Sequence, residues 1–461
     1  MEHKVGKKRK IGDVLTGTQV IALGFLSVIL AGALLLMLPC MSRSGQWTSF
    51  VDALFMSTTS VCVTGLTLVN IYEYWNIFGQ IVILILIQIG GIGVVALTIL
   101  LLMIFRKKVT LKDRMLIQET YSANSMAGLV VLTRKILRGI AVVELAGTLL
   151  YMIQFVPEYG IVRGSWISLF MSVSAFCNAG MEITGVESLA AYVSNPLINF
   201  VTMGLIILGG IGFYVWWDII YVVKKWWKTG VKNCFWKLKL HSKIVLTMTL
   251  SLILAGAGAV FILEYANPAT LGSLSLADKV QAALFQSVTT RTAGFSSINQ
   301  AEIRESTALV SSILMFIGGS PAGTAGGVKT MTIAMLFACT MGVVRGEKET
   351  VVYRRTVPKE TVKKALAVFS ISFAVFIFMI VVMSIAQPAP LVDLLYEVIS
   401  ALATVGLSRN LTGSLNLAGK LIIIICMYIG RIGPVSLVIA FRMRSKRKDR
   451  LNYSTENVIV G

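Results

Sequence analysis

Eight long apolar runs most constrain what this chain can fold into. Each run could cross the hydrocarbon core of a bilayer as a helix, which takes about 20 apolar residues. Only 14% of the 461 residues are charged, against about 25% in ordinary soluble domains. The sequence therefore predicts an all-α integral membrane protein with eight transmembrane helices. The runs lie at 18–39, 75–105, 135–156, 197–223, 243–265, 307–343, 362–386 and 418–441.

Basic residues mark alternate connections between these runs. Of the 42 Lys and Arg residues, 33 lie in 1–17, 106–138, 224–243, 344–364 and 442–450. The positive-inside rule then predicts that both termini lie in the cytoplasm. Membrane topology thus explains the net charge of +20, and we expect no nucleic-acid partner. The opposite loops carry 11 acids against 7 basic residues, and such a negative mouth raises the local cation concentration.

Four short segments divide the runs into repeats. Each lies between an odd-numbered run and the next even-numbered run and ends in a glycine, and the glycines follow at intervals of 115, 114 and 112 residues. These glycines are Gly65, Gly180, Gly294 and Gly406. A segment of about a dozen residues is too short to span a bilayer, so each is expected to re-enter the outer side. The pattern predicts four helix–pore-loop–helix repeats around a central pore, with pseudo-fourfold symmetry.

The repeats and their flanking segments have the following predicted boundaries. They are a cytoplasmic N-terminus (1–17), repeat 1 (18–105), repeat 2 (135–223), repeat 3 with a broken second helix (241–343), repeat 4 (360–443) and a cytoplasmic tail (444–461).

The backbone around the four glycines is the predicted binding site. A ring of carbonyl oxygens can replace the hydration shell of a monovalent cation. Glycine permits the positive φ angles that turn carbonyls inward, and helix C-termini ending there add partial negative charge. The predicted filter residues are Cys62, Val63, Thr64, Gly65, Cys177, Asn178, Ala179, Gly180, Arg291, Thr292, Ala293, Gly294, Ala403, Thr404, Val405 and Gly406.

The segment 318–328, GGSPAGTAGGV, interrupts the sixth apolar run. Glycine and proline destabilise helix interiors, so this span is predicted to break into two helices. Because only this repeat carries such an interruption, we interpret the segment as a gate beneath the filter; a passive kink is the alternative. The predicted gate comprises Gly318, Gly319, Ser320, Pro321, Ala322, Gly323, Thr324, Ala325, Gly326, Gly327 and Arg431.

Arg431 belongs to a second glycine-rich landmark, which follows each filter glycine. The landmark reads Gly-Gly-Ile-Gly at 90–93 and 209–212, Gly-Gly-Ser-Pro at 318–321 and Gly-Arg-Ile-Gly at 430–433. A charge near mid-membrane is costly and faces a cavity or a partner, so Arg431 is expected to hold loop carbonyls or to pair with an acid. Lys329 is expected to extend toward the cytoplasm.

These motifs resemble those of the Trk/Ktr/HKT superfamily of potassium transporters. The length of the chain is most similar to that of the KtrB-type membrane subunit. The resemblance implies K⁺ uptake across the plasma (inner) membrane, often with Na⁺ dependence, by a homodimer. Glycine at all four filter positions favours K⁺. The resemblance also implies gating by a separate cytoplasmic RCK subunit of the KtrA or TrkA type that binds ATP or ADP, docked on 106–134, 224–243 and the basic tail. No cofactor is expected in this chain.

Other readings of the sequence remain open. One is a Na⁺-selective or Na⁺/K⁺ cotransporting pore of the same fold. Another is a secondary carrier for a different cation, which would need midplane carboxylates and inverted repeats. A sensor that does not transport is a third. We do not expect an enzyme, because no cluster of His, Asp, Glu or Cys recurs at helical spacing.

Overall fold

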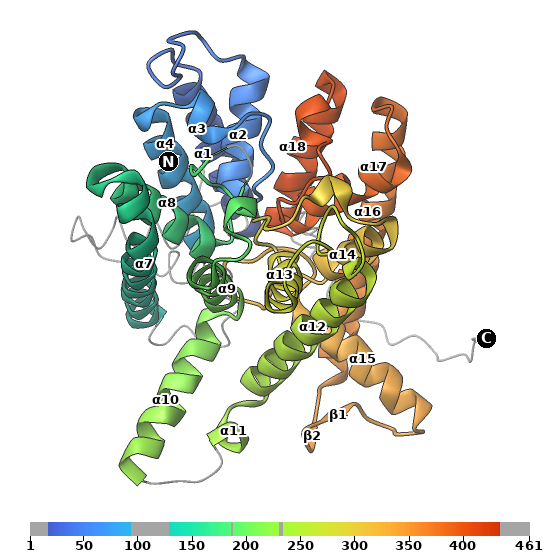
Figure 1. Ribbon diagram of the computed structural model, residues 1–461. Helices are drawn as coiled ribbons and strands as arrows, with labels where there is room; N and C mark the ends of the chain where they lie inside the picture. Colours follow the sequence, from blue (N-terminus) through green and yellow to red (C-terminus); the bar gives the residue numbers. More distant parts are fainter. Residues whose placement is uncertain (1–16, 94–128, 186–187, 230–233, 434–461) are drawn as a thin grey trace, which may run out of the picture.

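The computed structural model describes residues 17–93, 129–185, 188–229 and 234–433, and this part of the chain is mostly helical (Figure 1). Residues 1–16 of the predicted cytoplasmic N-terminus and the whole predicted tail 444–461 lie outside the described residues. So does most of the predicted docking loop 106–134.

A unit of long helix, short helix, extended segment and second helix occurs four times along the described chain. The long helices are α1 (Gly17–Leu36), α7 (Leu129–Tyr159), α12 (Leu240–Glu264) and α16 (Lys359–Ala386). The short helices are α2 (Phe50–Cys62), α8 (Ile161–Cys177), α13 (Leu276–Thr289) and α17 (Leu391–Ala403). The second helices are α4 (Ile77–Ile92), α9 (Pro196–Gly210), α14 (Glu305–Phe316) and α18 (Leu417–Ile432).

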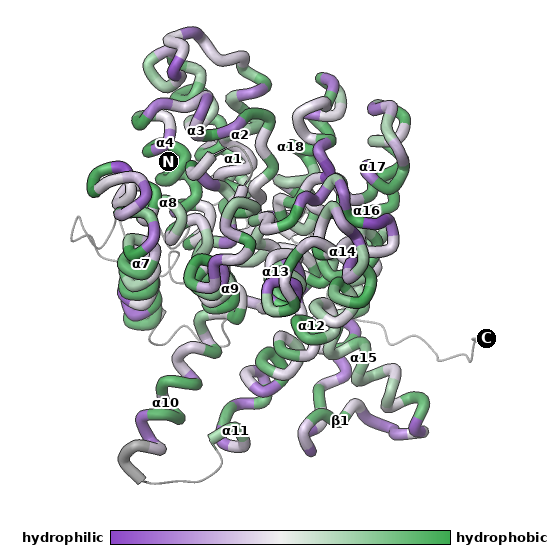
Figure 2. Tube along the Cα trace, viewed as in Figure 1, coloured by the Kyte–Doolittle hydropathy of each residue, from purple (hydrophilic) through white to green (hydrophobic). Residues whose placement is uncertain are grey.

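Smaller elements connect these units. They are α3 (Ile71–Tyr74), η2 (Ala190–Tyr192), α10 (Phe213–Thr229), α11 (Cys234–Lys237), η3 (Gln300–Glu302), α15 (Thr330–Val344), η4 (Thr412–Ser414) and the hairpin of β1 (Val351–Val352) and β2 (Arg355–Thr356). Figure 1 shows α10, α11, the end of α15 and this hairpin projecting beyond one end of the bundle. Hydrophilic residues gather in the connection between α15 and β1, whereas hydrophobic residues run along the bundle helices (Figure 2).

Side-chain caps begin five of the eight short and second helices. The Ser49 hydroxyl accepts from the Asp52 N–H at the start of α2, and the Ser275 hydroxyl accepts from the Asp278 N–H at the start of α13. Asn side chains cap the second helices α4, α9 and α18. These side chains satisfy N–H groups that have no partner within a helix, so they fix where each helix starts on either side of the extended segment.

A glycine on each of three long helices lets the following short helix approach closely. An added Cβ would lie 2.5 Å from the Ser57 hydroxyl at Gly32 and 2.5 Å from the Ser172 hydroxyl at Gly147. At Gly256 it would meet the hydroxyl of Ser287. Each serine donates to a carbonyl three residues before its glycine, for example Ser57 to Ile29 at 2.7 Å. Small residues permit such close packing between membrane helices.

The described second helices are shorter than the predicted spans. Four described helices, α1, α7, α12 and α16, are long and apolar enough to cross a membrane, and the bent pair α9–α10 makes a fifth if it is one span. Helices α4 and α18 end at Ile92 and Ile432, and residues 94–105 and 434–441 of those predicted spans lie outside the described residues.

The predicted span 197–223 is not one straight helix. Helices α9 and α10 meet at an angle of 100° around Gly212. Gly93, Gly212 and Gly433 all have φ near +90°, a conformation that is accessible mainly to glycine and that ends a regular helix. The third repeat differs from the others because it inserts a loop at this point.

Candidate functional site

The four extended segments meet in a closed ring. A Cβ added to Gly65 would lie 2.6 Å from the carbonyl oxygen of Ala179, and one added to Gly180 would lie 2.5 Å from that of Ala293. A Cβ on Gly294 would approach the Val405 oxygen, and a Cβ on Gly406 the Thr64 oxygen, more closely still. Each glycine therefore faces the carbonyl that precedes the next glycine, and the last faces the first. The φ angles of the four glycines are +97°, +62°, +80° and +99°, which an L side chain rarely adopts.

The backbone N–H groups of these segments point back toward the short helices. The Thr64 N–H donates to the Thr59 oxygen at 2.9 Å, the Ala179 N–H to the Ser174 oxygen and the Val405 N–H to the Ser400 oxygen, both at 2.8 Å. Hydroxyls reinforce this arrangement: Thr59 accepts from the Gly65 N–H and Ser400 from the Gly406 N–H, both at 3.0 Å. Because the N–H groups are held on the helix side, the carbonyl oxygens are left for the centre of the ring.

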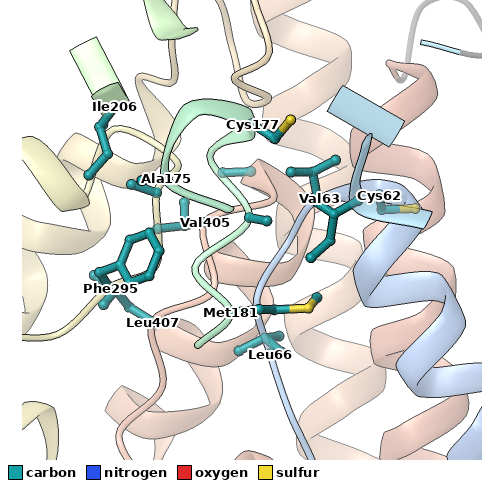
Figure 3. Packing of buried hydrophobic residues seen from close by; sticks show 14 of the residues in the cluster. Cys62, Val63, Leu66, Ala175, Cys177, Met181, Ile206, Phe295, Val405 and Leu407 are labelled. Atoms are coloured by element: carbon teal, nitrogen blue, oxygen red, sulfur yellow. The ribbon is translucent and has the colours of Figure 1, made fainter. Parts of the chain in front are cut away.

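Several predicted filter residues carry side chains that lie away from the ring. The Cys177 thiol faces Gln88 and Glu144, at 3.6 and 3.9 Å. Arg291 is buried and donates to the Thr249 oxygen of α12 at 3.4 Å. These residues can contribute only backbone to a pore. The residues after the four glycines are buried and apolar and pack around the extended segments (Figure 3); they are Leu66, Met181, Phe295 and Leu407.

The segment 318–328 lies directly beneath this ring. An added Cβ on Gly326 would lie 2.8 Å from the Ala403 oxygen and would overlap the Thr404 hydroxyl. The loop is anchored to the bend between α9 and α10, since the Ser320 N–H donates to the Gly210 oxygen at 2.9 Å and the Thr324 N–H to the Gly209 oxygen at 3.1 Å. The contact between the loop and this bent helix was not predicted from the sequence, although the glycines of the second landmark lie at the bend.

Two basic side chains hold the loop from different sides. Arg431 donates to the Thr324 oxygen at 2.7 Å and also to the Gly90 oxygen of α4. Among the described residues it makes no ion pair, so the expected alternative of a salt bridge is not observed. Lys329 donates to the Ala325 oxygen at 2.6 Å and to the Gly326 oxygen at 3.3 Å. It folds back onto the loop, contrary to the expectation that it would extend outward.

A polar cavity of about 620 Å³ lies on the other side of the ring. Its walls come from the residues that follow each of the four glycines, together with Ser188 and Ala190 from the approach to η2. We call this cavity the vestibule. The vestibule, the ring and the loop therefore form three successive layers.

Glu144, which lies alone in the third apolar run, is hydrogen-bonded to a neighbouring helix. Both of its carboxylate oxygens accept from the Gln88 amide at 3.1 Å. The described residues contain no group of three or more His, Cys, Asp or Glu side chains that could hold a metal ion.

Comparison with known proteins shows the family to which the chain is related. Residues 5–450 match the profile of the TrkH family, described as cation transport proteins. The chain is 40% identical over 447 residues to Ktr system potassium uptake protein B of Bacillus subtilis, covering 97% of each chain. It is 37% identical to the potassium/sodium uptake protein NtpJ of Enterococcus hirae, covering 98% of this chain and 99% of that one.

The fold is also similar to a solved structure. The potassium transporter TrkH from Vibrio parahaemolyticus superposes with a TM-score of 0.73 over 96% of this chain and 87% of that one, at 18% identity. The family transports cations and is not a family of enzymes. The chain belongs to the TrkH family of cation transport proteins.

Proposed function

We propose that this protein takes up K⁺ across the plasma (inner) membrane through the ring of glycines. The observation that carries the proposal is the closed ring, in which each glycine faces the carbonyl that precedes the next glycine. Four sets of carbonyls can replace the hydration shell of K⁺ without the trapping effect of a full charge. The filter consists of Cys62–Gly65, Cys177–Gly180, Arg291–Gly294 and Ala403–Gly406, and the same segments hold K⁺ during transport.

The proposed architecture has eight spans in four pseudo-symmetric repeats, with both termini in the cytoplasm. The order of elements supports it, because each long helix is followed by a short helix that ends close to the ring. The C-terminal ends of α2, α8, α13 and α17 therefore present partial negative charge where a cation would sit.

The gate of the proposed pore is the loop 318–328 together with Arg431. The loop lies against Ala403 and Thr404 beneath the ring, and Arg431 ties it to α4. A cation that leaves the ring would meet this loop and two basic side chains. Opening therefore requires that the loop leave its hydrogen bonds to α8, α9 and α10 and to Arg431 of α18.

Regulation in this proposal comes from a separate RCK subunit of the KtrA or TrkA type that binds ATP or ADP, acting on a homodimer. Support comes from the relative named as protein B of a Ktr system, since a system implies further components. The described part of the docking surface includes α10 and α11, which project from the bundle beside the β1–β2 hairpin (Figure 1).

A second candidate is a pore that carries Na⁺ as well as K⁺. The relative named as a potassium/sodium uptake protein favours it, because the two chains match over nearly their whole lengths. Channel-like flow and coupled transport would both be compatible with the ring.

The test is growth at low K⁺ and uptake of radioactive Rb⁺ in a bacterial strain that lacks its own K⁺ uptake systems. The chain is expressed alone and with a KtrA-type partner, with and without Na⁺. Rescue at low K⁺ is the expected result, and a gain from the partner supports the regulation. A membrane-inserted chain that gives no rescue in either case but carries Na⁺ would replace the first candidate with the second.

A further inference from the structure

The position two residues beyond each ring glycine carries an oxygen-bearing side chain. All four of these side chains line the vestibule; they are Thr67, Glu182, Ser296 and Ser408. Three of them are hydroxyls and one is a carboxyl group. Glu182 is the only ionisable side chain among the described residues that line the vestibule, so the negative charge of this layer is concentrated at one point.

Two of the three hydroxyls of this layer, those of Ser296 and Ser408, donate to other groups of the protein. Ser408 donates to the Glu397 carboxylate at 2.6 Å, and Ser296 donates to the Ile298 oxygen. Glu182 differs, because its Oε2 atom is buried and has no hydrogen-bond partner. The Ser188 hydroxyl hydrogen-bonds to the same carboxyl group, while Ser188 Oγ accepts from the Ser296 N–H at 3.1 Å. One carboxylate oxygen is thus held by the protein, and the other is left for a ligand.

The geometry points to a second cation site in the vestibule, where Glu182 binds a partly hydrated monovalent cation before it enters the ring. This inference rests on the proposed function, since it concerns the same pore. A buried carboxylate oxygen without a partner is costly, and a cation with its remaining water would satisfy it. The 620 Å³ cavity has room for several waters, each of which takes about 30 Å³ in the liquid.

The protonation of Glu182 gives this site a pH dependence. Burial raises the pKa of the Glu182 carboxyl to about 8, and the hydrogen bond from Ser188 opposes that rise. The group is therefore mostly neutral below that pH and negative above it. Of the charged groups in neighbouring elements, Glu397 accepts hydrogen bonds from Ser408 and Thr412, and Arg409 is paired with Asp393 at 2.7 Å.

The experiment measures Rb⁺ and K⁺ uptake over a range of external K⁺ concentrations for the wild-type chain and Glu182→Gln. At pH 8.5 we expect the substitution to raise KM by about 3- to 10-fold, the scale on which a single focusing charge changes local cation concentration. The maximal rate at saturating K⁺ should stay the same. Wild-type uptake at low K⁺ should rise as the pH increases through 8, and that of Glu182→Gln should not.

Two control variants and a competing ion test whether the effect comes from the charge of Glu182. Glu182→Asp retains the charge and should restore the pH dependence. Glu302→Gln removes an exposed acid of η3 that does not line the vestibule, and it should behave as wild type. External Na⁺ added at low K⁺ shows whether the site also accepts Na⁺, and any such inhibition should weaken in Glu182→Gln.

An unchanged KM and an unchanged pH profile in Glu182→Gln would overturn the vestibule site while leaving K⁺ uptake through the ring intact. A wild-type chain that carries no K⁺ at all would instead refute the proposed function. A variant that is inserted in the membrane but has lost its maximal rate would show that Glu182 supports the ring structurally, which also contradicts the inference.

Discussion

The ring and the loop beneath it are adjacent layers, yet they are built in different ways. The ring takes one glycine from each of four segments, and each glycine lies against the backbone carbonyl that precedes the next glycine. The loop comes from one repeat and is held by side chains and backbone of its neighbours, among them Arg431 and Lys329. Glycines that admit no Cβ leave the ring little room to shift, whereas a layer held by a few hydrogen bonds can be released.

The difference extends to the landmark glycines. Gly90, Gly209 and Gly430 lie so close to the carbonyls of Val61, Phe176 and Leu402 that a Cβ would overlap them. In the third repeat, Gly318 lies instead against Gly326 of its own loop. Three second helices therefore pack on the short helices that support the ring, and the fourth has given up that contact to form the loop. Substitutions in the two layers should thus have different consequences.

The largest expected effect belongs to Gly65→Ser in the ring. A side chain at φ +97° and 2.6 Å from the Ala179 oxygen strains the backbone by about 1–3 kcal/mol, so the carbonyls must shift. We expect the preference for K⁺ over Na⁺ to fall on the order of 10-fold, measured as the ratio of K⁺ to Na⁺ uptake. Gly204→Ser is the control, since a Cβ on this α9 glycine meets nothing within 4 Å. Unchanged selectivity in a folded Gly65→Ser protein would refute the filter assignment.

A somewhat smaller effect, an increase in K⁺ flux, is expected for Arg431→Ala. The change removes the donors to the Thr324 and Gly90 oxygens, and hydrogen bonds from charged groups contribute about 1.5–3 kcal/mol each. The loop should therefore be released more often, and K⁺ flux without the regulatory partner should rise about 5-fold or more.

Arg431→Lys distinguishes holding the loop from repelling cations. It keeps the charge but cannot reach both carbonyls with a planar group, so a raised flux in this variant too would assign the effect to the hydrogen bonds. Arg345→Ala, at an exposed position after α15, serves as the control. Flux that does not change in Arg431→Ala, or after deletion of 320–327, would remove the gating role.

Gly212→Ala should have an intermediate effect on the loop. Gly93 and Gly212 have nearly the same φ, +91° and +90°, but only at Gly212 would a Cβ meet the loop, 2.5 Å from the Pro321 oxygen. The pair therefore separates backbone strain from displacement of the loop. We expect Gly212→Ala to raise flux about 2- to 4-fold over Gly93→Ala at similar thermal stability. Equal fluxes in the two variants would show that the bend does not position the loop.

The smallest expected effect is that of Lys329→Met. Its ammonium group bonds only to carbonyls of its own loop, so its loss loosens the loop without removing the hydrogen bonds that join the loop to α9 and to Arg431 of α18. We expect the flux to rise about 2-fold at most. The exposed Lys364→Met on α16 is the matched control. An increase larger than that of Arg431→Ala would reverse the ranking of the two anchors.

The ring glycines and the break at 318–328 could be predicted because unusual backbone geometry restricts which residues can occupy a position. A ring that admits no Cβ requires glycine at each crossing, and Gly65, Gly180, Gly294 and Gly406 accordingly recur at nearly equal intervals. The break at 318–328 was predicted because glycine and proline disfavour helix.

The rest depended on tertiary contacts that no local pattern encodes. The bend at Gly212 lies against the loop, at the Pro321 oxygen, and an isolated Gly-Gly-Ile-Gly reads equally well as helix packing. Lys329 folds onto Ala325 and Gly326 because those carbonyls lie within its reach. The importance of Glu182 among many outer acids depends on the vestibule walls, which come from all four units.

The closure of the ring also has a consequence for biosynthesis. Gly406 meets Thr64, so the first and last units are neighbours although more than 300 residues separate them. Chains are synthesised from the N-terminus and their early parts form first, so three inserted units wait with an open side until the fourth arrives. A nascent or truncated chain that ends before residue 406 has no complete ring, so the ring can close only when synthesis is almost finished.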